Sequence, residues 1–331
     1  MSTPQRLGPV AAFSEHRISA RGVRRSFGNV HAVRDVTFEA LPGRVTGLVG
    51  PNGSGKTTLL LMLASLLAPD AGELRIGDID PVADPQGVRR VLGWMPDALG
   101  AWPALTARET LVTSGMLYDL RRSDAQARAA ELLALVELDD LADAPARVLS
   151  RGQKQKLGLA RALVHDPSIL LLDEPASGLD PQARITLRTL LRRFAAEGRT
   201  VLISSHILSE LEEVVDDAVF LLAGSTVAGA SVNGATREWR VRIADVDATT
   251  DSFGPDAIVE RISAALGIPA SAVRVDRRDV LLVFASEQAA AAGLGQIVGA
   301  GIPVVEFAPV VGALEHAFLD LRNRTIEGSQ S

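Results

Sequence analysis

The chain has 331 residues, of which 47% are hydrophobic, and a formal net charge of −6 at pH 7. This length and composition predict a globular protein with one large and one small domain, and they exclude an intrinsically disordered chain. The absence of cysteine excludes disulfides, thiolate zinc sites and thiol nucleophiles. The negative net charge argues against a broad nucleic-acid-binding face, so no nucleic-acid partner is expected.

Residues 1–16 read as a flexible N-terminal tail, without the charged start and long apolar centre of a signal peptide. The longest apolar run, Leu59–Ala68, is interrupted by Ser65. It is shorter than the ~18 to 20 apolar residues that span a bilayer, so we interpret it as a buried helix.

Residues 17–230 alternate short β-branched runs with longer helical segments, a pattern that indicates an α/β domain with a parallel sheet covered by helices. The predicted strands are Val45–Val49, Ile169–Leu172 and Thr200–Ser204. The predicted helices are one after residue 55 and two over Ala125–Val136 and Gly152–Val164.

A phosphate-binding loop lies between the first of these strands and its helix. The segment "GPNGSGKT" matches G-x-x-x-x-G-K-[ST], in which glycines let backbone N–H groups face phosphates. Lys56 would contact the β- and γ-phosphates, and the Thr57 hydroxyl would ligate Mg²⁺. The predicted nucleotide-binding residues here are Gly50, Pro51, Asn52, Gly53, Ser54, Gly55, Lys56, Thr57 and Thr58.

The segment "SILLLDEP", residues 168–175, is an apolar strand that ends in two acids. Such a strand delivers its carboxylates to the edge where α/β folds bind ligands. We expect Asp173 to hold Mg²⁺ through water and Glu174 to accept a proton from the attacking water as general base.

A second helix N-terminus that suits an anion occurs in "LSRGQKQKLGLARAL", residues 149–163. Ser150 is the predicted N-cap, and Gly152 exposes backbone N–H groups at the helix start. This arrangement predicts a second phosphate contact in the same chain.

After the stretch of small residues over 223–238, the pattern of the sequence changes, and residues 236–322 form a predicted accessory domain. Its strands and helices follow the order β-α-β-β-α-β, which is typical of a ferredoxin-like α+β sandwich, and "GALEHAFLDL" is predicted as a further helix. Residues 323–331 read as a second flexible tail.

Over about residues 17–230 the chain resembles the nucleotide-binding subunits of ATP-binding cassette transporters. The resemblance rests on the phosphate loop, "LLLDEP", "LSRGQ" as the family signature, "SGLDP" as the dimer-contacting loop and "SSHIL" as the switch-histidine loop. It implies a P-loop NTPase cassette with a parallel sheet core and a helical subdomain. The implied ligands are ATP and Mg²⁺.

The same resemblance implies further site residues. Phe27 stands where the family stacks an aromatic ring on adenine, and His206 where a histidine contacts the γ-phosphate and holds Glu174 and the water in line. It also implies a head-to-tail dimer in which each ATP lies between the phosphate loop of one subunit and Ser150–Gln153 of the other, so Ser150, Gly152 and Gln153 serve the partner's nucleotide.

Two residues depart from the family pattern. Asp97, in "LGWMPDALG", replaces a glutamine that senses Mg²⁺ and the γ-phosphate; as a hard oxygen donor it either keeps that role with altered geometry or is a plain loop acid. Arg151 replaces the first glycine of the signature, and the sequence leaves open whether it adds a charge near the partner's ATP or faces solvent.

The number and order of the predicted segments distinguish between the functions found in this family. One cassette, an ordinary helical segment before the signature and no membrane helices predict an ATPase subunit that docks on a separate integral membrane permease at the cytoplasmic face of the membrane. The β-α-β-β-α-β tail resembles that of export ATPases, which favours export. The alternative is a soluble regulatory switch that dimerises on ATP with little turnover.

Overall fold

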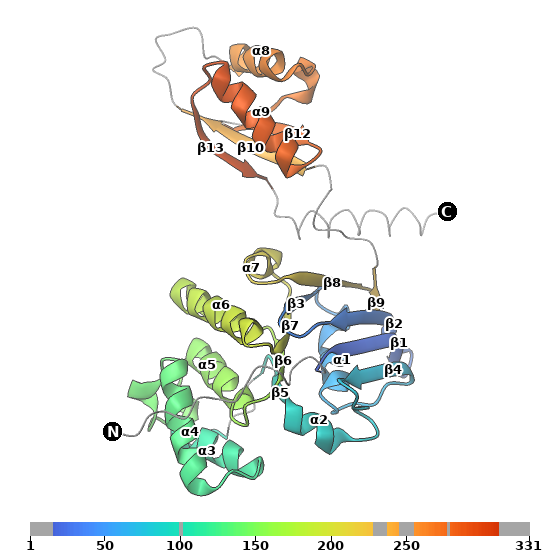
Figure 1. Cartoon of the computed structure of the whole chain (residues 1–331), viewed down its shortest axis with the longest axis vertical. Coiled ribbons are helices and arrows are strands. Elements are labelled where there is room, and N and C mark those ends of the chain that lie inside the picture. Colours follow the sequence, from blue (N-terminus) through green and yellow to red (C-terminus); the bar gives the residue numbers. More distant parts are fainter. Residues whose placement is uncertain (1–15, 99–101, 228–236, 245–254, 277–278, 311–331) are drawn as a thin grey trace. The chain divides into compact units, whose positions relative to one another are not determined.

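The computed structural model describes residues 16–98, 102–227, 237–244, 255–276 and 279–310. Contacts between Cα atoms divide the chain into an N-terminal unit, Met1–Ala228, and a C-terminal unit, Gly229–Ser331. Each unit has its own layer of strands and helices (Figure 1).

Among the described residues of the N-terminal unit, nine strands form one mixed sheet in the order β4-β1-β2-β9-β8-β3-β7-β6-β5. Strands β8, β3, β7, β6 and β5 run parallel, whereas β1 pairs antiparallel with both β2 and β4. The strands are β1 Ile18–Phe27, β2 Val30–Ala40, β3 Val45–Val49, β4 Ala71–Ile76, β5 Leu92–Met95, β6 Ile169–Asp173, β7 Thr200–Ser205, β8 Asp217–Leu222 and β9 Ser225–Thr226.

The three predicted strands are confirmed as β3, β6 and β7. Every residue of these strands is buried, as expected for the centre of a parallel sheet covered on both faces. The predicted parallel core is therefore present. The strands β1, β2 and β4, which the sequence pattern did not predict, add an antiparallel part and make the sheet mixed.

The helices of the N-terminal unit lie on both sides of the sheet, with α3, α4 and α5 grouped away from α1 (Figure 1). They are α1 Lys56–Leu63, α2 Pro85–Val91, α3 Ala107–Leu117, α4 Arg122–Leu135, α5 Arg151–Ala162, α6 Pro181–Ala196 and α7 Leu208–Glu212, with short 3₁₀ turns at η2 Asp139–Leu141 and η3 Ala146–Val148. The helices predicted over 125–136 and 152–164 correspond to α4 and α5. The apolar run after the phosphate loop begins as the buried helix α1, which confirms that interpretation.

The C-terminal unit has the predicted β-α-β-β-α-β order, and its four described strands form an antiparallel sheet in the order β11-β12-β10-β13. Val241, Ile262, Leu282 and Ile297 are fully buried in its core. The elements are β10 Arg237–Ile243, α8 Pro255–Leu266, η5 Ala270–Ala272, β11 Arg274–Asp276, β12 Asp279–Phe284, α9 Glu287–Gly299 and β13 Val304–Pro309. The helix predicted at 312–321 lies outside the described residues.

Candidate active site

The candidate site lies at the carboxyl ends of four neighbouring parallel strands, β3, β7, β6 and β5. The phosphate loop follows β3, His206 follows β7, Glu174 follows β6 and Asp97 follows β5. Because parallel strands end at the same edge of a sheet, these four segments converge there, which is where open α/β sheets bind ligands.

The phosphate loop turns tightly between β3 and α1. A Cβ on Gly50 would lie 2.3 Å from the Leu221 carbonyl oxygen, and one on Gly55 would lie 2.4 Å from the Ala32 carbonyl oxygen. Gly55 also has a φ of 103°, in the left-handed region that side chains disfavour. Both glycines are therefore required by close backbone packing, while residues 51–53 at the tip of the loop are exposed.

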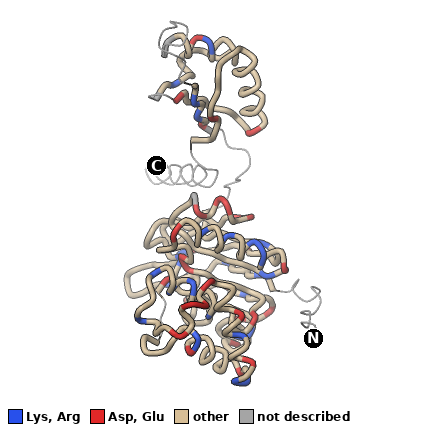
Figure 2. The backbone as a smooth tube through the Cα atoms, turned by 90° about the vertical axis from the view of Figure 1, so that its left-hand side faces the viewer, with Lys and Arg blue, Asp and Glu red and all other residues tan. Residues whose placement is uncertain are grey.

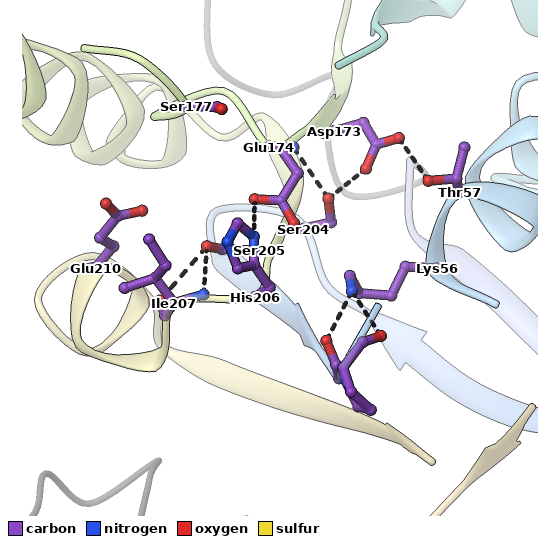
Figure 3. A network of polar contacts seen from close by, with 12 residues as sticks. Lys56, Thr57, Asp173, Glu174, Ser177, Ser204, Ser205, His206, Ile207 and Glu210 are labelled. Carbon is purple, nitrogen blue, oxygen red and sulfur yellow. Dashed lines mark hydrogen bonds and ion pairs between the residues drawn. The ribbon is translucent and has the colours of Figure 1, made fainter. Parts of the chain in front are cut away.

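Lys56 begins α1, and its ammonium is directed back into the loop. Its Nζ donates to the carbonyl oxygens of Gly50, at 2.7 Å, and Pro51, at 3.2 Å (Figure 3). Burial lowers the pKa of Lys56, and the nearby Glu174 and Asp173 carboxylates act in the opposite direction. A buried ammonium at a helix N-terminus, held here by neutral carbonyl oxygens, is suited to an anionic ligand.

Thr57, Asp173 and Ser204 form a chain of hydrogen bonds across the site (Figure 3). The Thr57 hydroxyl donates to Asp173 Oδ2 at 3.0 Å, and the Ser204 hydroxyl donates to Asp173 Oδ1 at 2.5 Å. Hydroxyl and carboxylate oxygens are the donors that Mg²⁺ takes in proteins, so Thr57 and Asp173 fit this ion. Ser204 was not predicted as a site residue, although the register pairs it with Asp173 across β6 and β7.

Glu174 and His206 contact each other directly, with His206 Nδ1 2.9 Å from Glu174 Oε2 (Figure 3). The Glu174 side chain is only 14% exposed, whereas that of His206 is 46% exposed. Burial raises the pKa of Glu174 above its ordinary value, and the hydrogen bond and charge of His206 partly oppose this increase. A carboxylate with a raised pKa beside an imidazole is typical of a general base.

Ser150 and Gln153 form a capping box at the start of α5. The Ser150 hydroxyl accepts from the Gln153 backbone N–H at 3.2 Å, and the Gln153 side chain accepts from the Ser150 N–H at 2.8 Å. The N-cap prediction for Ser150 is therefore confirmed. A Cβ on Gly152 would lie 3.0 Å from the Gly178 carbonyl oxygen, so this glycine permits close packing against the 177–181 loop.

Arg151 is exposed at the start of α5, and it also contacts a loop of its own chain. Its Nη2 donates to the Ser177 hydroxyl at 2.6 Å, and its aliphatic stem packs against Gly178, where a Cβ would lie 2.8 Å from Arg151 Cγ and Cδ. The side chain thus links the signature helix to the "SGLDP" loop of its own chain.

Phe27 and Asp97 are both exposed. Phe27 ends β1 with 48% of its surface accessible, and the Arg25 guanidinium lies 4.9 Å from its ring centroid. Asp97 follows β5, two residues beyond Met95, which pairs with Leu172 on β6, so it lies at the same sheet edge as Asp173. Their predicted roles in stacking and sensing stay predictions.

The sequence places the chain among known proteins. The ABC transporter family profile matches residues 33–177. The chain is 37% identical over 215 residues to the Nod factor export ATP-binding protein I of Bradyrhizobium sp. (strain SNU001), over 65% of this chain and 70% of that relative. The chain belongs to the ABC transporter family. It is also 37% identical over 199 residues to the ABC transporter ATP-binding protein NatA of Bacillus subtilis (strain 168), over 60% of this chain and 81% of NatA.

Solved structures agree with this assignment. The ATP-binding subunit of an ABC transporter superposes with a TM-score of 0.60 at 28% identity, over 64% of this chain and 88% of that one. A dimeric ATP-binding cassette bound to ADP and phosphate superposes with a TM-score of 0.59 at 26% identity, over 63% of this chain and 96% of that one. The chain is the ATP-binding subunit of an ABC transporter, and it hydrolyses ATP to drive transport. Among the described residues, no helix is both long and apolar enough to cross a membrane.

Proposed function

We propose that this subunit drives export through a separate membrane permease, with Glu174 as the general base of ATP hydrolysis. The observation that carries the proposal is the Glu174–His206 pair, which lies beside Lys56, Thr57 and Asp173 at one sheet edge. Export is supported by the relative from Bradyrhizobium, which is named for the export of Nod factor. The chemistry of the cargo resides in the permease.

Each residue of the site has a distinct part in the proposed reaction. Lys56 binds the phosphate oxygens as a buried cation, and Thr57 and Asp173 hold Mg²⁺, with Asp97 as a third candidate ligand. When bound, Mg²⁺ neutralises negative charge on the phosphates during their transfer. Glu174 takes the proton of the attacking water, and His206 fixes the orientation of the Glu174 carboxylate.

The proposed working unit is a head-to-tail homodimer at the cytoplasmic face of the membrane. In it, the capped N-terminus of α5, with Ser150, Gly152 and Gln153, binds the nucleotide held by the partner's phosphate loop, and Phe27 stacks on adenine. Dimeric cassettes among the similar solved structures support this arrangement. In Figure 2, Lys and Arg are interspersed with Asp and Glu along the described backbone, which fits contacts with proteins better than a nucleic acid.

The test replaces Glu174 by Gln in the full chain. ATP turnover is expected to fall by about 10²–10⁴-fold, since the general base is lost while its size is kept. The variant is expected to elute as an ATP-bound dimer in size-exclusion chromatography, whereas the parent returns to the monomer after hydrolysis. A Glu174→Gln variant that turns over ATP like the parent would refute the base assignment.

A pull-down from gently solubilised membranes tests the partner and the location. Stoichiometric recovery of an integral membrane permease with the tagged chain is the expected result. Recovery from the soluble fraction alone, with no such partner, would favour the soluble ATP-dependent switch instead.

A further inference from the structure

The backbone of Glu174 adopts an unusual conformation that its neighbours maintain. Its φ is 51°, in the left-handed region, which is unfavourable for a residue with a side chain. Such conformations persist where the surroundings fix them, and they cluster at active sites. The Glu174 N–H is held from β7, because it donates to the Ser204 hydroxyl at 3.0 Å and to the Ser204 carbonyl oxygen at 3.2 Å.

The carbonyl oxygen of Glu174 is held from the other side, by α5. It accepts from the Ser177 N–H at 3.0 Å, within the turn, and from Gln155 Nε2 at 3.3 Å. Gln155 is only 4% exposed, so its amide is a buried polar group for which this hydrogen bond is a specific partner. Neither Gln155 nor this contact was predicted from the sequence.

Arg151, which lies one helical turn before Gln155 on α5, contacts the same 174–178 segment. Residues four apart lie on one face of a helix, so Arg151 and Gln155 both face the segment 174–178. Arg151 donates to the Ser177 hydroxyl and packs over Gly178, and Gln155 donates to the Glu174 carbonyl. Two side chains of the signature helix thus hold both ends of the turn that carries the general base.

We propose that Arg151 and Gln155 are positioning residues for ATP hydrolysis, which hold the 174–178 turn so that the Glu174 carboxylate points toward the reacting water. This inference rests on the proposed role of Glu174. Since Ser150–Gln153 begin the same helix, the two contacts also join the segment proposed to bind the partner's nucleotide to the chain's own base.

The first experiment uses Gln155→Glu and Gln155→Met in the full chain. In Gln155→Glu, the introduced carboxyl group donates to the Glu174 carbonyl when it is protonated, whereas its ionised form has no proton to donate and repels that oxygen. Burial raises the pKa of a carboxyl group at this position into the measurable range. The kcat of Gln155→Glu, divided by that of the parent at each pH, is therefore expected to fall about tenfold as pH rises and to recover as pH falls.

The Gln155→Met variant is the matched control, because it keeps the volume and has no proton to gain or lose. Its kcat is expected to be about tenfold below the parent at every pH, with the KM for ATP unchanged, since the phosphate loop is untouched. The parent is measured over the same pH range, and Arg151 and the Lys156–Glu137 ion pair of α5 are common to all three proteins. A pH-independent ratio for Gln155→Glu would overturn the role of Gln155.

The second experiment uses Arg151→Met and Arg151→Lys. Arg151 is exposed, so neither variant threatens folding, and this pair tests the Arg151 part of the proposal even if the buried Gln155 variants unfold. Arg151→Met keeps the stem and loses the donor, so kcat is expected to fall severalfold, whereas Arg151→Lys retains a donor for Ser177 and recovers most of it. Equal kcat in Arg151→Met and the parent would overturn the role of Arg151. Failure of the proposed function gives a different result: Glu174→Gln would then be as active as the parent, and the assignment of the base itself would be wrong.

Discussion

The hydroxyl of Ser204 offers a quantitative test of how the site is built. Ser204 is fully buried on β7, and its hydroxyl both donates to Asp173 Oδ1 and accepts from the Glu174 N–H. Ser204→Ala removes a hydrogen bond to a charged acceptor, which is worth about 2 kcal/mol of folding free energy. The Glu174 N–H keeps the Ser204 carbonyl as its partner, so no further loss of free energy is expected there.

The assay is differential scanning calorimetry of the full chain, with Thr46→Val as the matched control. Thr46 is also fully buried, on the neighbouring β3, but its hydroxyl has no hydrogen-bond partner within the described part of the chain. Ser204→Ala is expected to lower the Tm of the N-terminal unit by ~4–8 °C, the shift that ~2 kcal/mol produces in a domain of this size. Thr46→Val is expected to leave the Tm unchanged or slightly raised, since an unpartnered hydroxyl is replaced by a methyl group.

The Ser204→Ala variant is also expected to need more Mg²⁺ for half-maximal ATPase activity, because Asp173 loses the donor that fixes its carboxylate. Equal Tm values for Ser204→Ala and Thr46→Val would refute the reasoning. They would mean that the short contact with Asp173 contributes no more than a buried hydroxyl without a partner.

Three further predictions concern the base, the sensing loop and the C-terminal unit. His206→Ala removes the hydrogen bond and the charge with which His206 lowers the pKa of Glu174, so this pKa rises and the acidic limb of the kcat–pH profile moves to higher pH; a limb that stays in place argues against coupling of the pair. Asp97→Asn and Asp97→Gln are expected to change ATP turnover or its dependence on Mg²⁺, and unchanged steady-state kinetics in both would leave Asp97 a plain loop acid. Ile262→Ala, in the core of the C-terminal unit, is expected to cost about 3 kcal/mol in that unit's calorimetric transition while leaving ATP turnover within about twofold, and a large loss of turnover would contradict independent units.

Much of this site could be predicted from the sequence because its motifs are local. The phosphate loop needs glycine at positions 50 and 55, because neighbouring backbone atoms leave no room for a Cβ there. Its position between a strand and a helix can be read from the sequence pattern. The strands β3, β6 and β7 are short, buried along their whole length and rich in Val, Leu and Ile, which is the usual signature of a parallel sheet.

The remainder depends on pairings between distant segments. Nothing near Ser204 marks it as a partner of Asp173; the contact exists because β6 and β7 pair with these two residues opposite each other. Strands β1 and β2 are rich in exposed polar residues and pair through an irregular register, so their antiparallel arrangement is not evident from apolar runs.

Arg151 stands where the family signature has a glycine, and the structure shows why the two glycine positions of the signature differ in their tolerance of a side chain. Residue 151 is the first residue of α5, with an exposed side chain, so its backbone needs no glycine. Residue 152 packs more tightly, because a Cβ there would lie 3.0 Å from the Gly178 carbonyl oxygen. The first glycine can therefore be exchanged for a side chain that reaches Ser177 while the second is kept, and the exchange adds a contact between the signature helix and the catalytic turn without disturbing the capping box of Ser150 and Gln153.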